Sequence, residues 1–302
     1  MAVTLAQQVE RVRDALNQSN SEELCTFKGW LPEVGSPKTG IKLDDVMAGD
    51  RLSHVLVELG HELVYVTSYD SQTLTATCPP WFRQRNGSPA NDDYPADSVA
   101  VIGPQWSHWT IVQQLVAGYH ALHPDLFQVK TTTLTTTAVE QRYELPADCD
   151  DIHDIQLHYP DASGTQRAVN TWSIKTTNPD GKRYLHISPV GMGGLTLDVT
   201  YKAKPIVPDP ADGSFQFTES GLLDSAEDLP VMYAKAHLVA SMESSRAQTK
   251  SIEQSERGKY IQAGTTTSVA RLWMQQFQDR LKEERRKLLE LYPPRVHREL
   301  NG

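Results

Sequence analysis

The chain has 302 residues, 39% hydrophobic and 22% charged, so it can bury a core and is not composed like a disordered protein. At roughly 100–200 residues per domain, this length allows two domains. Its formal net charge of −9 argues against a protein that wraps nucleic acid, because phosphate contacts need clustered Lys and Arg. The mean hydropathy of −0.46 and the absence of a long apolar run predict no membrane span.

The first segment is expected to be an amphipathic helix. Thr4 and Gln7 form a capping box. Apolar residues follow at spacings of three and four, which predicts a helix over residues 5–16 with one buried face. Residues 17–40 contain Asn, Ser, Gly and Pro and are expected to be mostly loop.

Two antiparallel β modules are predicted, with a helix between them. Short alternating runs separated by turn residues place the first module at residues 41–104. A helix over residues 106–123 follows and ends at Pro124. A threonine-rich stretch at 131–137 has high β propensity, and alternating runs place the second module at 138–205.

The last third of the chain is predicted to be helical. After a Pro-rich joint, a helix over residues 228–254 and a second over 267–292 are expected. The predicted fold is therefore α+β. A helical bundle (the N-terminal helix, the central helix and two long C-terminal helices) carries two inserted β modules and an extended C-terminal tail. The expected parts are a helical core (1–40, 105–137 and 206–292), two β modules (41–104 and 138–205) and a docking tail (293–302).

Charge is concentrated at the C-terminal end. Residues 271–302 hold eight basic and five acidic residues, a net charge of +3, so the rest of the chain carries −12. An acidic body with a basic end predicts a protein–protein interface there. The alternative for the helix is a solvated face with i,i+4 ion pairs, such as Glu283 with Lys287.

No catalytic or metal-binding pattern emerges from the sequence. Cys25, Cys78 and Cys149 stand far apart without a CxxC pair, which predicts free, buried thiols rather than disulfides or a zinc site. His120 and His123 lie three apart on one helix face and fit either a metal site or, as we favour, a helix end beside a proline. No cofactor, no metal and no enzymatic activity are therefore expected.

Two further features suggest chemistry but are more simply explained as local structure. Gly191-Met192-Gly193-Gly194 lies between two predicted strands and opens no helix, so a hairpin turn is favoured over a phosphate-binding loop. Adjacent carboxylates rarely converge on one substrate atom, so the paired aspartates are expected to be turn and loop residues. These pairs are Asp44-Asp45, Asp92-Asp93 and Asp150-Asp151.

The order of parts, together with several short phrases, resembles the head-to-tail connector (adaptor, or neck) proteins of tailed bacteriophages. The phrases that carry the resemblance are AGDRL (48–52), ELVYVTS (62–68), SQTLTA (71–76), YELP (143–146), LTLDVTY (195–201) and LYPPR (291–295). The resemblance covers most of the chain. It departs from the family at CPPW (78–81), which stands where related sequences continue into an Arg-Gly and Gly-Thr segment.

The resemblance implies a structural protein of the virion neck, synthesised in the host cytoplasm. Its implied partners are further copies of itself in a ring, as a dodecamer, the portal protein, and a downstream neck or tail-completion protein. Double-stranded DNA would pass through the lumen without sequence-specific binding, past an acidic body that repels phosphate. The C-terminal segment is the implied portal-docking element, with residues Tyr292, Pro293, Pro294, Arg295, Val296, His297, Arg298 and Leu300.

Two other function classes remain open from the residues alone. A glycan-binding module, part of the tail or of a surface, would use the β regions and the aromatic rings of Trp81, Trp106 and Trp172. A hydrolase with a β-sheet cleft would need a critical carboxylate, and the sequence offers no convincing candidate.

Overall fold

The computed structural model describes thirteen stretches of the chain, which together form four α-helices and fourteen strands. The described residues are 3–16, 23–32, 39–46, 52–60, 62–79, 83, 95–137, 142–159, 166–169, 171–176, 182–187, 193–250 and 265–293. The chain divides into two compact units. We call them the barrel unit (1–118, 208–216 and 228–277) and the sandwich unit (119–207, 217–227 and 278–302).

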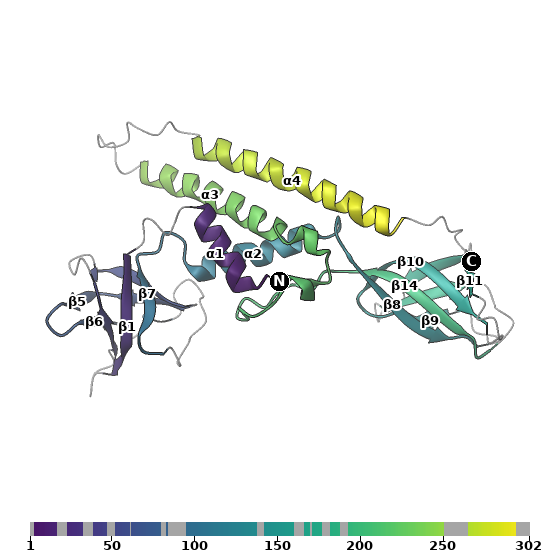
Figure 1. Ribbon diagram of the computed structural model, residues 1–302, viewed down its shortest axis with the longest axis horizontal. Helices are drawn as coiled ribbons and strands as arrows, with labels where there is room; N and C mark the ends of the chain where they lie inside the picture. Colours follow the sequence, from purple (N-terminus) through teal and green to yellow (C-terminus); the bar gives the residue numbers. More distant parts are fainter. Residues whose placement is uncertain are drawn as a thin grey trace. The chain divides into compact units, whose positions relative to one another are not determined.

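Seven described antiparallel strands make up the sheet of the barrel unit (Figure 1), in the order β4-β3-β7-β1-β2-β6-β5. Their bounds are β1 (Glu23–Pro32), β2 (Thr39–Asp44), β3 (Val55–Leu59), β4 (Glu62–Val66), β5 (Ser68–Asp70), β6 (Thr75–Cys78) and β7 (Ser98–Ile102). Alternate residues point inward and are fully buried, as Phe27, Ile41 and Val64 show. This alternation gives the unit a core of its own.

The two margins of this sheet are joined by a single residue. β4 stands at one end of the strand order and β5 at the other, yet only Thr67 separates them in the chain. The Thr67 backbone N–H donates to the Thr77 carbonyl oxygen at 2.9 Å, which continues the pairing of β5 with β6. The sheet is thus nearly closed, and closure removes the exposed strand edges that otherwise invite pairing with other chains.

Helices complete the barrel unit. Helix α1 (Leu5–Ala15) lies against α3 (Leu229–Lys250) (Figure 1). The predicted capping box is confirmed, because the Thr4 hydroxyl accepts from the Gln7 N–H and the Gln7 side chain accepts from the Thr4 N–H. Helix α2 (His108–Leu122) approaches α3 at Gly118, where a Cβ atom would stand 3.1 Å from the backbone of Pro230.

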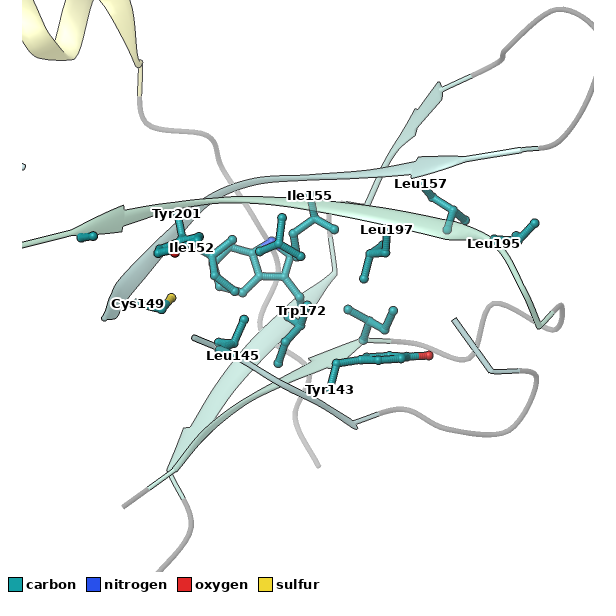
Figure 2. Packing of buried hydrophobic residues seen from close by; sticks show 14 residues of the cluster. Tyr143, Leu145, Cys149, Ile152, Ile155, Leu157, Trp172, Leu195, Leu197 and Tyr201 are labelled. Carbon is teal, nitrogen blue, oxygen red and sulfur yellow. The ribbon is translucent and has the colours of Figure 1, made fainter. Parts of the chain in front are cut away.

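The sandwich unit consists of two sheets in the orders β11-β10-β14-β8 and β12-β13-β9. The bounds are β8 (Gln128–Thr135), β9 (Arg142–Glu144), β10 (Cys149–His158), β11 (Gln166–Ala168), β12 (Trp172–Thr176), β13 (Arg183–Ile187) and β14 (Thr196–Ala203). Both sheets contribute to one apolar core. Figure 2 shows the Trp172 indole among these side chains, near Ile152 and Leu145. Two short 3₁₀ helices, η4 (Phe217–Ser220) and η5 (Asp224–Ala226), and the end of α4 (Thr265–Leu291) also belong to this unit.

The predicted fold, a helical bundle with two inserted β modules, is wrong. The four helices and fourteen strands take comparable shares of the described residues, and each β assembly has its own core. The main error lies in residues 17–40. We expected these to be mostly loop, but β1 lies there, and β2 begins at its end. The Gly, Pro and Ser residues of this stretch favoured a loop and outweighed the short alternating pattern of β1. In that pattern the side chains of Cys25 and Phe27 are buried in the barrel.

Candidate docking site at the end of helix α4

The end of α4 is fixed to the sandwich unit by a buried carboxylate. Glu284 occupies the apolar stripe of the helix, three residues after Leu281 and four before Leu288, and its side chain is 1% exposed. It accepts hydrogen bonds from Lys287 Nζ at 2.7 Å and from two further donors, the Ser225 hydroxyl on η5 and the Arg280 guanidinium. Arg280 also donates to the Ser225 carbonyl oxygen at 2.7 Å, so the network joins α4 to η5 at two points.

The environment of Glu284 favours its charged form. Burial raises the pKa of this carboxyl, but the hydrogen bonds from Lys287, Ser225 and Arg280 together outweigh burial. The pKa therefore lies below its ordinary value, and the group is ionised at neutral pH. This carboxylate has a structural role, because all three of its donors come from the helix itself or from the segment beneath it.

Beside this network lies an open cleft of about 290 Å³. The residues that line it come from the end of α2, the segment that leads into β8, strands β10 and β14, and α4. They are His123, Pro124, Asp125, Phe127, Asp150, Asp151, Lys202, Arg285 and Leu289. Charged groups and apolar carbon atoms are mixed in the lining, which suits contact with a polypeptide segment.

Each carboxylate of the cleft lies beside a basic side chain. His123 Nε2 lies 2.9 Å from an Asp150 oxygen. In the other two pairs, Lys202 Nζ lies 3.0 Å from Asp151, and Arg285 Nη1 lies 2.9 Å from Asp125. Lys202 also stands over the Phe127 ring, 5.1 Å from its centre. The charges of an incoming protein chain can compete for these contacts, and such charge complementarity is how interfaces gain specificity.

The first residues of the predicted docking segment also lie on the sandwich unit. The Tyr292 N–H donates to the Leu288 carbonyl oxygen at 2.9 Å, which continues the helical pattern of α4 by one residue. The Tyr292 ring packs edge-to-face on His153 of β10, with 5.8 Å between the ring centres. Tyr292 and Pro293 are thus placed by the structure. The other predicted docking residues (Pro294, Arg295, Val296, His297, Arg298 and Leu300) lie outside the described residues.

The thiols are free and buried, as predicted. Burial raises the pKa of the Cys78 thiol to about 12 and that of the Cys149 thiol to about 11. Both groups are therefore protonated at neutral pH and are poor nucleophiles. Their place in the two apolar cores explains why these residues are present.

Of the other candidate groups, His123 and Asp45 have side-chain partners. His123 pairs with Asp150, as favoured for a helix-end histidine, and His120 is exposed. Asp45 accepts from the Thr26 hydroxyl at 2.9 Å, while Asp92 and Asp93 lie outside the described residues. Within the described stretches, no three His, Cys, Asp or Glu side chains gather as metal ligands would.

Of the tryptophans proposed for glycan binding, one is buried and so presents no ring to a ligand. Trp172 is buried in the sandwich core, Trp106 is half-buried in the barrel unit, and Trp81 lies outside the described residues. A ring at the centre of an apolar core serves packing.

Sequence reasoning missed two buried acids of the barrel unit as well as Glu284. Glu58 on β3 has a side chain only 4% exposed and accepts from Arg13 of α1 at 2.6 Å and from the His108 N–H of α2 at 3.0 Å. Glu62 on β4 binds Arg83 through two hydrogen bonds of 2.8 Å, and Arg83 lies over the Trp30 ring. Both carboxylates tie other segments to the strands of the barrel.

No protein-family model matches this sequence, and no curated protein is similar to it in sequence. Among the helices that the structure describes, none has the length and apolar character needed to cross a membrane.

Proposed function

We propose that this protein is a head-to-tail adaptor of a tailed bacteriophage, a structural protein without catalytic activity. In this role, copies of the chain form a ring under the portal, as a dodecamer, and join the capsid to a downstream neck or tail-completion protein. Double-stranded DNA passes through the lumen without sequence-specific contacts. The sequence phrases and the order of helices and strands support this proposal, together with the unequal distribution of charge.

The observation that carries the proposal is that the residues just before the basic tail are held in place by contacts with the sandwich unit. Glu284 ties α4 to η5, and the Tyr292 ring rests on β10. The chain therefore enters residues 294–302 from a position that is packed against β10, near a cleft lined by ion pairs. A tail that starts from a fixed point loses less conformational freedom on docking than one that starts from a loose end, which favours its use as a binding element.

The tail should account for portal binding. We expect deletion of residues 294–302 to abolish binding to a candidate portal ring while the circular dichroism spectrum and thermal transition of the protein remain unchanged. The double substitution Arg295→Ala with Arg298→Ala should weaken binding at least tenfold, about 1.4 kcal/mol. Surface-captured portal rings, titrated with each variant, give these affinities.

Arg286→Ala is the matched control for charge. This arginine is exposed on α4 and pairs only loosely with Glu290 at 3.5 Å, so its loss removes a basic group from the same end without touching the tail. We expect portal binding close to that of the unaltered protein. Equal binding by the truncated chain would remove the tail from the proposal.

A further inference from the structure

Strand β8 ends the four-stranded sheet and leaves one side without a neighbour in the part of the chain that the structure describes. All eight of its residues pair with β14 in unbroken register, from Gln128 opposite Ala203 to Thr135 opposite Thr196. The Thr136 N–H, one residue beyond the strand, points toward this partner and donates to the Leu195 carbonyl oxygen at 2.8 Å. Backbone groups alternate in direction along an antiparallel strand. The N–H groups of Thr131, Thr133 and Thr135 therefore point to the free side.

In the part of the chain that the structure describes, this edge shows none of the usual protections against strand pairing. Natural edge strands are blunted by proline, bulges, charges or short length. β8 is eight residues long, contains no proline and no bulge, and includes four threonines, which favour strands. Its one charge, Lys130, is neutralised by Asp148 at 2.7 Å.

The opposite margin of the same sheet is protected. There β11 covers only residues 156–158 of β10. In the uncovered half of β10 the pairing with β14 is broken by two register shifts, after Cys149 and after Ile152. Arg183 Nη1 donates to the carbonyl oxygens of Cys149 and Asp150 at 2.5 and 2.7 Å, so their hydrogen-bonding capacity is already used. Among the described margins of this sheet, the β8 side is the one that presents a long, regular row of backbone donors and acceptors.

We propose that two copies of this chain pair antiparallel through β8, joining their four-stranded sheets into one continuous sheet. The strand is self-complementary, because its exposed side chains are threonines and pairing brings no like charges together. A two-fold contact uses the same patch on both copies and leaves no β8 edge open. Since the β10 margin is protected, the association closes at a dimer and does not extend into a fibre.

The dimer is expected to be weak. A single strand pair buries little surface compared with stable interfaces, which suggests a Kd on the order of 10⁻⁵ M. The inference concerns the free chain and does not depend on the adaptor role. A contact of this strength can open when copies assemble on a larger partner.

Sedimentation velocity over roughly 1 µM to 1 mM tests the inference with two variants at one position. Thr133→Pro removes an N–H that points to the free side, so it should spare the pairing of β8 with β14 and raise the dimer Kd at least tenfold. Thr133→Val keeps that N–H and removes only the hydroxyl, which contacts Asp198 at 2.9 Å, so its dimer Kd should stay within about twofold of the unaltered value.

A second variant keeps the test decisive if the Thr133→Pro protein misfolds. Thr131→Lys with Thr133→Lys places opposed cations along the edge and should also raise the dimer Kd at least tenfold. A chain that stays monomeric at 1 mM overturns the proposal, as does a dimer unchanged by both Thr133→Pro and the lysine pair. If the chain is monomeric but Thr133→Pro weakens binding to a candidate portal, the edge serves that partner, and the proposed self-pairing is wrong.

Discussion

Glu284→Ala is expected to lower the free energy of unfolding of the sandwich unit by about 3 kcal/mol, because it removes a buried carboxylate that accepts three hydrogen bonds. The change leaves a cavity in the apolar stripe of α4 and takes away the acceptor for Arg280 and Lys287. It also releases the helix from Ser225 on η5. Urea denaturation followed by circular dichroism, fitted for two units, measures the loss.

Glu283→Ala is the matched control for this prediction. Glu283 is the neighbouring residue of the same helix and contacts the same two cations, at 3.2 Å from Arg280 and 3.3 Å from Lys287, but its side chain is 49% exposed. Exposed ion pairs contribute little, so its loss should cost less than about 1 kcal/mol. Equal effects for the two variants would show that burial of Glu284 is not what stabilises the contact.

The Glu284 carboxylate should make the stability of the sandwich unit depend on pH in the acidic range. The pKa of Glu284 is lower in the folded chain than the ordinary value of 4.5, so the unfolded state takes up a proton at higher pH than the folded state does. Its contribution to stability is complete above about pH 4.5 and is lost as the pH falls through the folded value. Glu284→Gln should therefore flatten the dependence of unfolding free energy on pH in this range.

Glu58→Ala should destabilise the barrel unit by about 3–4 kcal/mol. The substitution leaves Arg13, with a side chain 14% exposed, without its 2.6 Å partner, and a nearly buried charge that loses its partner is costly. It also removes the acceptor of the His108 N–H at the beginning of α2, where a negative charge favours the helix. Thermal and urea unfolding of the full chain measure the effect.

Glu10→Ala tests whether the position of the acid matters. Glu10 also pairs with Arg13, at 3.7 Å on the same helix, but its side chain is 64% exposed. We expect a loss below about 0.5 kcal/mol. A loss as large as that of Glu58→Ala would contradict the view that Glu58 anchors α1 and α2 to the barrel.

Local patterns predicted the elements whose signals lie close together in the chain. The capping box at Thr4 predicted the start of α1, and Pro124 predicted the approximate end of α2. Strand β1 was missed because its place is decided by distant pairing. Thr26 of β1, for example, lies opposite Val99 of β7, more than 70 residues away. Local propensity does not report such contacts.

The Glu284 network could not be predicted from local sequence patterns either. Glu284 stands in the run Lys-Glu-Glu-Arg-Arg-Lys, which is typical of a solvated helix face, and the predicted i,i+4 pair of Glu283 with Lys287 is indeed present at 3.3 Å. Only the spacing of Phe277, Leu281, Glu284 and Leu288 could have signalled burial. Ser225, which completes the network, comes from a segment 59 residues away. The role of the tail remains a prediction.

The most direct test of the adaptor proposal is the mass and shape of the full chain mixed with a candidate portal ring, by light scattering and negative-stain microscopy. The proposal predicts a complex whose added mass corresponds to about twelve chains and whose images show a collar under the portal that is absent from the portal alone. A portal whose mass and outline stay unchanged at saturating concentrations of this protein would contradict the adaptor role.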